Sequence, residues 1–107
     1  MPVATRVFDG DRLRADLWLP KAEATTLYVT FRQRIPDPGS FTEAGPVGGA
    51  LNAGLAHLRI QSRWNDWFLN AETQGLEAAL SAVRPRFDTV LALGYSMGGY
   101  GALRLAR

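Results

Sequence analysis

Cysteine, histidine and lysine are scarce in this chain of 107 residues, which contains no cysteine, one histidine and one lysine. Without thiols the chain forms no disulfide, no thiolate metal site and no cysteine nucleophile. The single lysine, Lys21, does not stand in the Gly-Lys-Ser or Gly-Lys-Thr of a phosphate-binding loop. We therefore expect neither a metal nor an organic cofactor, and we interpret the single histidine, His57, as a structural residue.

The sequence also lacks long apolar runs and clusters of like charge. No stretch approaches the roughly 18 apolar residues of a membrane span, and the first ten residues lack the apolar centre of a signal peptide. The net charge is only +2, and the arginines are scattered among acidic residues rather than forming a run that follows a phosphate backbone. These absences predict a cytoplasmic protein that binds neither membranes nor nucleic acid.

The hydrophobic share of 47% is sufficient for one packed domain. Alternating apolar and polar residues predict two antiparallel strands, over residues 5–8 and 12–19, joined by the turn Asp9-Gly10-Asp11. A β-branched and aromatic run predicts a buried strand over 25–31 that leads into a proline-containing loop. The remaining expected elements are a strand, a helix, a strand and a helix, over residues 57–61, 72–83, 88–93 and 97–107.

The motif Gly94-Tyr95-Ser96-Met97-Gly98 lies between the last predicted strand and the last predicted helix. A serine on such a sharp turn is held in a strained backbone conformation, and glycines two positions to either side relieve the clash. The turn raises the Ser96 hydroxyl above the edge of the sheet, near the first amides of the helix. A dinucleotide-binding fingerprint is not supported, because no third glycine follows Gly99-Tyr100-Gly101 at the required spacing.

This order of elements and the extended motif resemble the N-terminal half of the α/β-hydrolases, with Ser96 at the nucleophile position. The resemblance implies a partial α/β-hydrolase fold, in which two N-terminal antiparallel strands precede a mostly parallel sheet with flanking helices. It also implies that residues 1–107 are a single incomplete domain whose C-terminal half is absent. The acid and the histidine that follow the serine in this family would then lie beyond Arg107.

The implied function is that of an esterase or other acyl-hydrolase that transfers the acyl group of a small-molecule substrate through Ser96. The 107-residue chain alone is expected to be inactive, because Ser96 lacks a base. The alternative is a truncated or pseudo-hydrolase that acts as a binding or assembly module. In either case the strand over 88–93 would lack a sixth strand beside it, and its apolar edge favours self-association.

The resemblance also implies an oxyanion hole. One donor is the amide of Met97, the residue after the nucleophile. The second is expected from the loop after the third strand, at Arg32 or Gln33, for which a solvated basic turn is the alternative interpretation.

Three aromatic residues are candidates for substrate binding. They are Tyr95 in the motif itself, and Trp64 and Trp67 in the segment Trp-Asn-Asp-Trp-Phe after the strand over 57–61. The alternative is that the aromatic residues of this segment anchor the following helix and that Asn65 or Asp66 helps form its entry turn. Asp66 precedes Ser96 in the sequence, so it is not in the position of the usual acid.

Overall fold

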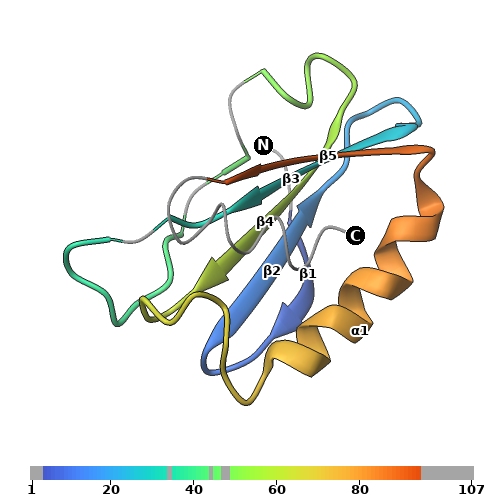
Figure 1. Cartoon of the computed structure of the whole chain (residues 1–107). Helices are drawn as coiled ribbons and strands as arrows, with labels where there is room; N and C mark the ends of the chain where they lie inside the picture. The colour runs from blue at the N-terminus through green and yellow to red at the C-terminus, as the bar shows by residue number, and fades with distance from the viewer. Residues whose placement is uncertain (1–3, 34, 44, 47–48, 95–107) are drawn as a thin grey trace.

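The structure is a computed structural model that describes residues 4–33, 35–43, 45–46 and 49–94. These residues form five strands, one α-helix and a short 3₁₀ helix (Figure 1). In chain order the elements are β1 (Thr5–Asp9), β2 (Leu13–Trp18), β3 (Thr26–Phe31), β4 (Ala56–Ser62), α1 (Thr73–Val83), η1 (Arg84–Arg86) and β5 (Thr89–Gly94).

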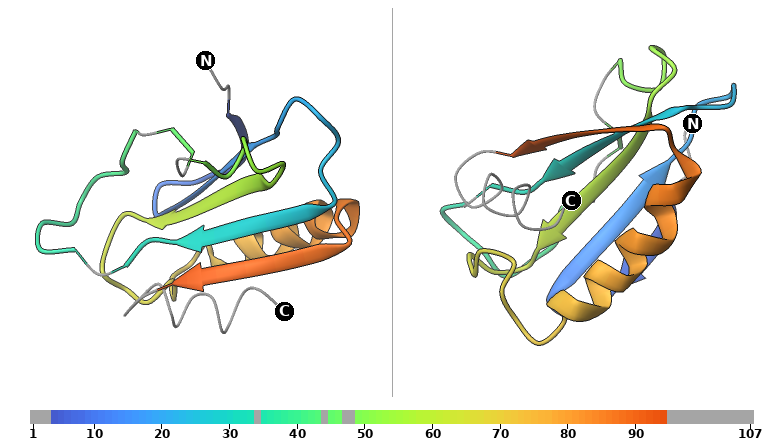
Figure 2. Two further views of the ribbon diagram at one scale, coloured as in Figure 1. Left: turned by 90° about the horizontal axis from the view of Figure 1, so that it is seen from above. Right: turned by 45° about the vertical axis from the view of Figure 1, so that its right-hand side comes forward.

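The five strands form one sheet in the order β1-β2-β4-β3-β5. The pairs β1–β2 and β2–β4 are antiparallel, whereas β3 pairs in parallel with both β4 and β5. The helix α1 runs along one face of the twisted sheet (Figure 2). Because β3, β4 and β5 run in the same direction, their carboxyl ends meet at one edge of the sheet, which we call the carboxyl edge.

The hydrophobic core lies between this face of the sheet and α1. Alternate residues of the strands point into it, as period-2 alternation requires. In α1 the same core receives Leu76 and Val83, with Leu80 packed against it, which is the spacing of one face of a helix. The buried strand residues of the core are Leu13, Ala15, Leu17, Leu27, Val29, Phe31, Ala56, Leu58 and Ile60.

The individual strands and α1 lie within two residues of their predicted ranges, but the predicted fold class is wrong. Two N-terminal antiparallel strands followed by a mostly parallel sheet with flanking helices were expected. The β1–β2 pair is antiparallel as expected, but β2 also pairs antiparallel with β4, so that only two of the four pairings are parallel. Moreover, α1 is the single α-helix of the described residues. The result is a small mixed sheet with a helix on one face rather than a partial α/β-hydrolase fold.

The composition of the connection between β3 and β4 explains much of this difference. An α/β arrangement needs helices in such parallel crossovers to cover the sheet. Here the crossover contains Pro36, Pro38, Gly39 and Pro46, residues that disfavour or interrupt a helix. Its described residues accordingly form loop and turn. The helix predicted over 97–107 lies outside the described residues.

Glu72, directly before α1, fastens the N-terminal hairpin to the helix. Its carboxylate accepts hydrogen bonds from the amides of Asp11, Arg12 and Leu13 at 2.9, 2.8 and 2.8 Å. Gly10 lies beside it, and a β-carbon at this position would collide with the Glu72 carboxylate and displace it from these hydrogen bonds. Burial acts to raise the pKa of Glu72, but the three amides outweigh it and lower that pKa below its ordinary value.

We predict that Glu72→Gln lowers the free energy of unfolding by about 2 kcal/mol, because glutamine offers one acceptor oxygen where the carboxylate uses two. Urea denaturation at pH 7 would measure the loss. The matched control is Glu77→Gln, which makes the same change of charge within α1 itself. Equal stability of the two variants would contradict the role of Glu72.

Candidate active site at the carboxyl edge

The register of the parallel strands brings the ends of three strands together. Phe31 at the end of β3 is opposite Ile60 of β4 on one side and Gly94 of β5 on the other. Arg32 and Gln33 therefore leave the sheet beside the point where β5 ends. Three of the predicted site residues, Tyr95, Ser96 and Met97, lie outside the described residues and follow Gly94 directly in the chain.

Arg32 ties the carboxyl edge together through both its backbone and its side chain. Its amide donates to the carbonyl of Ile60 at 2.9 Å, which continues the ladder between β3 and β4. Its guanidinium donates through Nη1 to the carbonyls of Ser40 and Ser62, at 2.7 and 3.1 Å, and burial lowers the pKa of Arg32. Because the Arg32 amide is occupied, the amide of the exposed Gln33 is the better candidate for the second oxyanion donor.

Asp66 is the centre of the loop that follows β4. One of its carboxylate oxygens accepts from the hydroxyl of Ser62 at 2.6 Å and from the amide of Phe68 at 3.2 Å. The other oxygen accepts from the side-chain amide of Asn70 at 2.8 Å. Both oxygens are thus used within the loop, which agrees with a role for Asp66 in the entry turn of α1 rather than in acid–base chemistry.

Two consecutive residues of this loop, Trp67 and Phe68, have left-handed backbone conformations, with φ of 58° and 61°. Phe68 is fully buried and meets Phe31 edge to face at a centroid distance of 5.7 Å, while its carbonyl accepts from the Thr73 hydroxyl at 2.6 Å. Phe68 is therefore the aromatic anchor of the helix. The indoles of Trp64 and Trp67 remain 47% and 44% exposed.

The sequence contained no signal for this left-handed pair, because neither residue is glycine, asparagine or aspartate, the types that favour such a conformation. The loop that contains the pair is tied to the loop after β3. The Asn65 side chain exchanges two hydrogen bonds with the backbone of Ile35, at 3.0 and 2.8 Å. The amide of Gly39 donates to the carbonyl of Arg63 at 2.8 Å. The two loops are thus fixed to each other.

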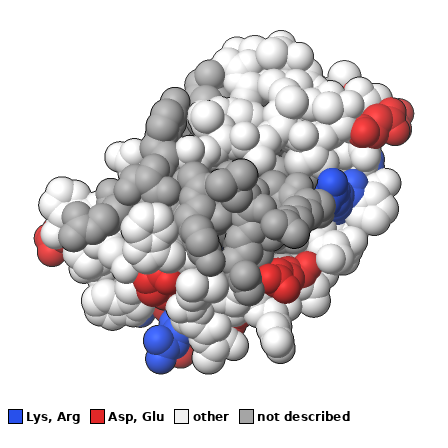
Figure 3. All heavy atoms as spheres, in the orientation of Figure 1, with Lys and Arg blue, Asp and Glu red and all other residues white. Residues whose placement is uncertain are grey.

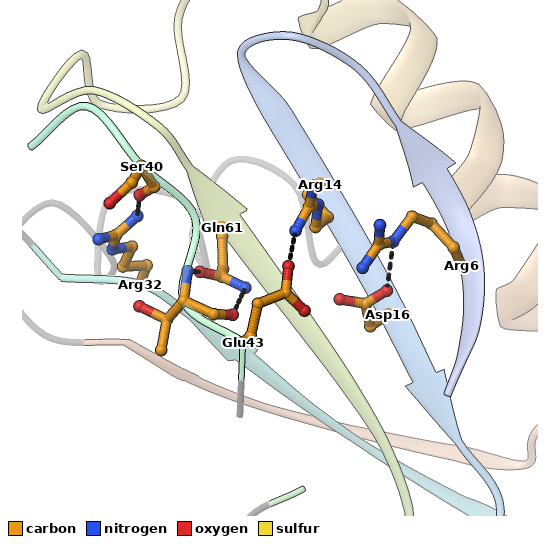
Figure 4. A network of polar contacts seen from close by, with 8 residues as sticks. Arg6, Arg14, Asp16, Arg32, Ser40, Glu43 and Gln61 are labelled. Atoms are coloured by element: carbon orange, nitrogen blue, oxygen red, sulfur yellow. Dashed lines mark hydrogen bonds and ion pairs between the residues drawn. The ribbon is translucent and has the colours of Figure 1, made fainter. Parts of the chain in front are cut away.

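The sheet face opposite α1 is polar at β2 and β4, and residues 40–43 lie over part of it (Figure 4). Gln61 exchanges two hydrogen bonds with the backbone of Thr42, at 2.8 and 3.1 Å. Arg14 forms an ion pair of 2.6 Å with Glu43, and its guanidinium lies 4.3 Å from the centroid of the Phe41 ring. The loop thus supplies partners for Gln61 and for Nη1 of Arg14, whereas Nε of Arg14 is buried without a hydrogen-bond partner among the described residues.

His57 lies on the same polar face but far from the carboxyl edge, at the start of β4. It is fully buried and stacks against the rings of Trp18 and Tyr28 at 5.5 and 5.6 Å. Its Nε2 atom is 2.8 Å from the hydroxyl of Thr30. Burial, with a smaller effect of the nearby Arg59 charge, lowers the pKa of His57 to about 4. The neutral ring is part of the packing, as the sequence predicted.

Other kinds of site find little support in the described part of the chain. Among these residues no group of three or more His, Cys, Asp or Glu side chains could hold a metal ion. The blue arginine and lysine side chains visible in Figure 3 are separated from one another. A hollow of about 350 Å³ between residues 19–24 and Arg86–Phe87 lies at the amino ends of β3 and β5, opposite the carboxyl edge.

Within the described ranges, no helix has the length and apolar character needed to cross a membrane. Comparisons of the chain with protein-family models, with curated proteins and with solved structures find no match. The candidate site must therefore be judged on its own geometry.

We predict that the protein loses stability as the pH falls from 6.5 towards 4. The unfolded chain takes up a proton on His57 near its ordinary pKa of 6.5, whereas the folded site resists protonation until about 4. The stabilisation of the folded state that comes from a neutral His57 is complete above pH 6.5. Below pH 4 it is lost, and the free energy of unfolding is then lower by at most about 3 kcal/mol. Chemical denaturation at several pH values would measure it.

The matched variant is His57→Gln, which should lack this part of the pH dependence while keeping the part due to carboxylates. Because His57 is the only histidine, its NMR titration is unambiguous. A ring that titrates near pH 6.5 in the folded protein would contradict the prediction.

Proposed function

We propose that this protein is a serine hydrolase, related to the α/β-hydrolases, that transfers an acyl group through Ser96. The observation that carries the proposal is the register of β5. This strand pairs in parallel with β3 and ends at Gly94, opposite Phe31. Ligands bind to sheets of this kind at the carboxyl ends of the parallel strands, and Ser96 follows the end of β5 by two residues in the sequence. The Gly-x-Ser-x-Gly spacing supports a nucleophile there.

In the proposed reaction the Ser96 hydroxyl attacks the carbonyl carbon of an ester, and its proton passes to a base and then to the departing alcohol. Water attacks the resulting ester on Ser96, releases the acid and restores the serine. The negative charge on the carbonyl oxygen would be held by the amides of Met97 and Gln33. His57 is unsuited as the base, since it is buried at the opposite end of β4. A base from outside these 107 residues is part of the proposal.

The test is labelling with a fluorophosphonate probe, which reacts with activated serines. In the complete gene product we expect one adduct, on Ser96, and none in Ser96→Ala. We also expect Ser96→Ala to lower kcat/KM for p-nitrophenyl acetate by at least about 10³, whereas the 107-residue chain alone should be no faster than that variant. An adduct on Ser40, Ser62 or Ser81 instead would sink the nucleophile assignment.

A second candidate function is assembly with another chain, without catalysis. It is favoured by β5, the last strand in the order of the sheet. Among the described residues β5 pairs only with β3. Leu91 and Leu93, on the face opposite α1, are 50% and 40% exposed. An apolar strand with an unpaired edge is a site for strand addition by another chain.

We predict that the 107-residue chain self-associates through β5, as seen by sedimentation velocity over a range of concentrations. Leu91→Lys should weaken the association, because a charge on an edge strand opposes pairing. Leu19→Lys is the control, since Leu19 is 55% exposed but follows β2 rather than lying on β5. A chain that stays monomeric at all concentrations would remove the support for this second function.

A further inference from the structure

The hollow at the amino ends of β3 and β5 is bounded by two segments that are far apart in the chain. One is the connection from β2 to β3, and the other is the end of η1 with the residue that follows it. The volume of about 350 Å³ is within the range of pockets that bind small molecules, roughly 300–1,000 Å³. The eight lining residues are Leu19, Pro20, Lys21, Ala22, Glu23, Ala24, Arg86 and Phe87.

Hydrogen bonds fix the two segments to each other. The carbonyl of Thr25 accepts from the amides of Asp88 and Thr89, at 2.8 and 3.2 Å, where β3 and β5 begin to pair (Figure 2). Two of the lining residues, Ala24 and Phe87, are half-buried and pack against the hydrophobic core. The base of the hollow is therefore a preformed part of the fold, and a preformed site loses little entropy when a ligand binds.

The lining combines an apolar base with exposed charges. Five of the eight lining residues are apolar, whereas Lys21, Glu23 and Arg86 are charged and exposed. The ion pairs between described residues lie elsewhere, on β1, β2 and the loop after β3. The lining thus has two cations and one anion, a net charge of +1, and neither cation is paired with a carboxylate among the described residues.

Charge and polarity together select one class of ligand. A cation would be repelled by the net positive charge, and a ligand with several phosphates would bring more negative charge than the lining balances and no apolar surface for its base. An uncharged ligand would leave both cations unused. A ligand with a single negative charge and an apolar body matches both parts of the hollow.

We propose that the hollow binds a small monocarboxylate, whose apolar body rests on Ala24 and Phe87 and whose carboxylate lies near Lys21 and Arg86. Ammonium and guanidinium groups both donate charge-assisted hydrogen bonds to carboxylate oxygens. Because both cations are exposed to water, each contributes modestly, and we expect binding in the millimolar range. The site consists entirely of described residues and does not rest on the proposed hydrolase activity.

The experiment is a titration of the protein with hexanoate, followed through its backbone amide signals by NMR. We expect saturable shifts that are concentrated at residues 19–24 and 86–88. Hexanol, which keeps the apolar chain and lacks the charge, should bind at least 5-fold more weakly. Acetate, which keeps the charge and lacks the chain, should bind at least 10-fold more weakly. Binding of either compound as tight as that of hexanoate, or saturable shifts elsewhere alone, would overturn the proposal.

Single changes of charge around the hollow should act in opposite directions. Lys21→Gln and Arg86→Gln should each weaken hexanoate binding by about 3-fold, whereas Glu23→Gln should strengthen it by about 3-fold. The matched control is Arg84→Gln, because Arg84 is an exposed residue of the same short helix that does not line the hollow. Equal weakening by Arg84→Gln and Arg86→Gln would indicate general attraction of anions and would refute the site.

This inference and the proposed hydrolase activity can fail separately. We expect Ser96→Ala to bind hexanoate as the parent protein does, because the hollow lies at the edge of the sheet opposite the carboxyl edge. Absence of probe labelling on Ser96 would therefore leave the carboxylate site standing. Absence of saturable hexanoate binding by the parent protein would remove the site and leave the nucleophile assignment untouched.

Discussion

The parallel pairing of β3 with both β4 and β5 is the constraint on which the rest of the structure depends. It places Arg32, the loop after Ser62 and the end of β5 at Gly94 at one edge of the sheet. It also engages the amide of Arg32 in a hydrogen bond to the carbonyl of Ile60, within the ladder between β3 and β4. Gln33 and the loop after β4 therefore lie at the same edge as Gly94, which precedes Ser96 by two residues in the sequence. His57 lies at the opposite end of β4.

The second constraint is that β4 is buried on both faces, although within the described residues a helix covers only one of them. Of its seven residues, six are buried, and they include the polar His57 and Gln61. A buried polar group must find a partner, since an unpaired one costs about 1–3 kcal/mol. The backbone of Thr42 in the loop meets this need for Gln61, and the Thr30 hydroxyl of β3 lies 2.8 Å from Nε2 of His57. Covering the face with a loop rather than a helix also ties the loop to the sheet beside the carboxyl edge.

Much of the site is consequently built from contacts between segments far apart in the chain. Ile35 holds Asn65, and the ring of Phe31 in β3 meets the buried ring of Phe68. Phe68 turns inward as the anchor of the helix, while its neighbour Trp67 is 44% exposed. The assignment of Trp64 and Trp67 to substrate binding stays a prediction.

By itself the sequence determined the strands and the helix of the described residues, because alternation and the spacing of Leu76, Leu80 and Val83 are local patterns that burial of one face selects. It predicted the antiparallel β1–β2 hairpin but not the antiparallel pairing of β2 with β4, nor that a loop lies over part of the second face. It also contained no sign of the left-handed pair Trp67-Phe68. Only the tertiary structure decided these features, since each depends on free energy gained between residues that the chain separates widely and the fold brings together.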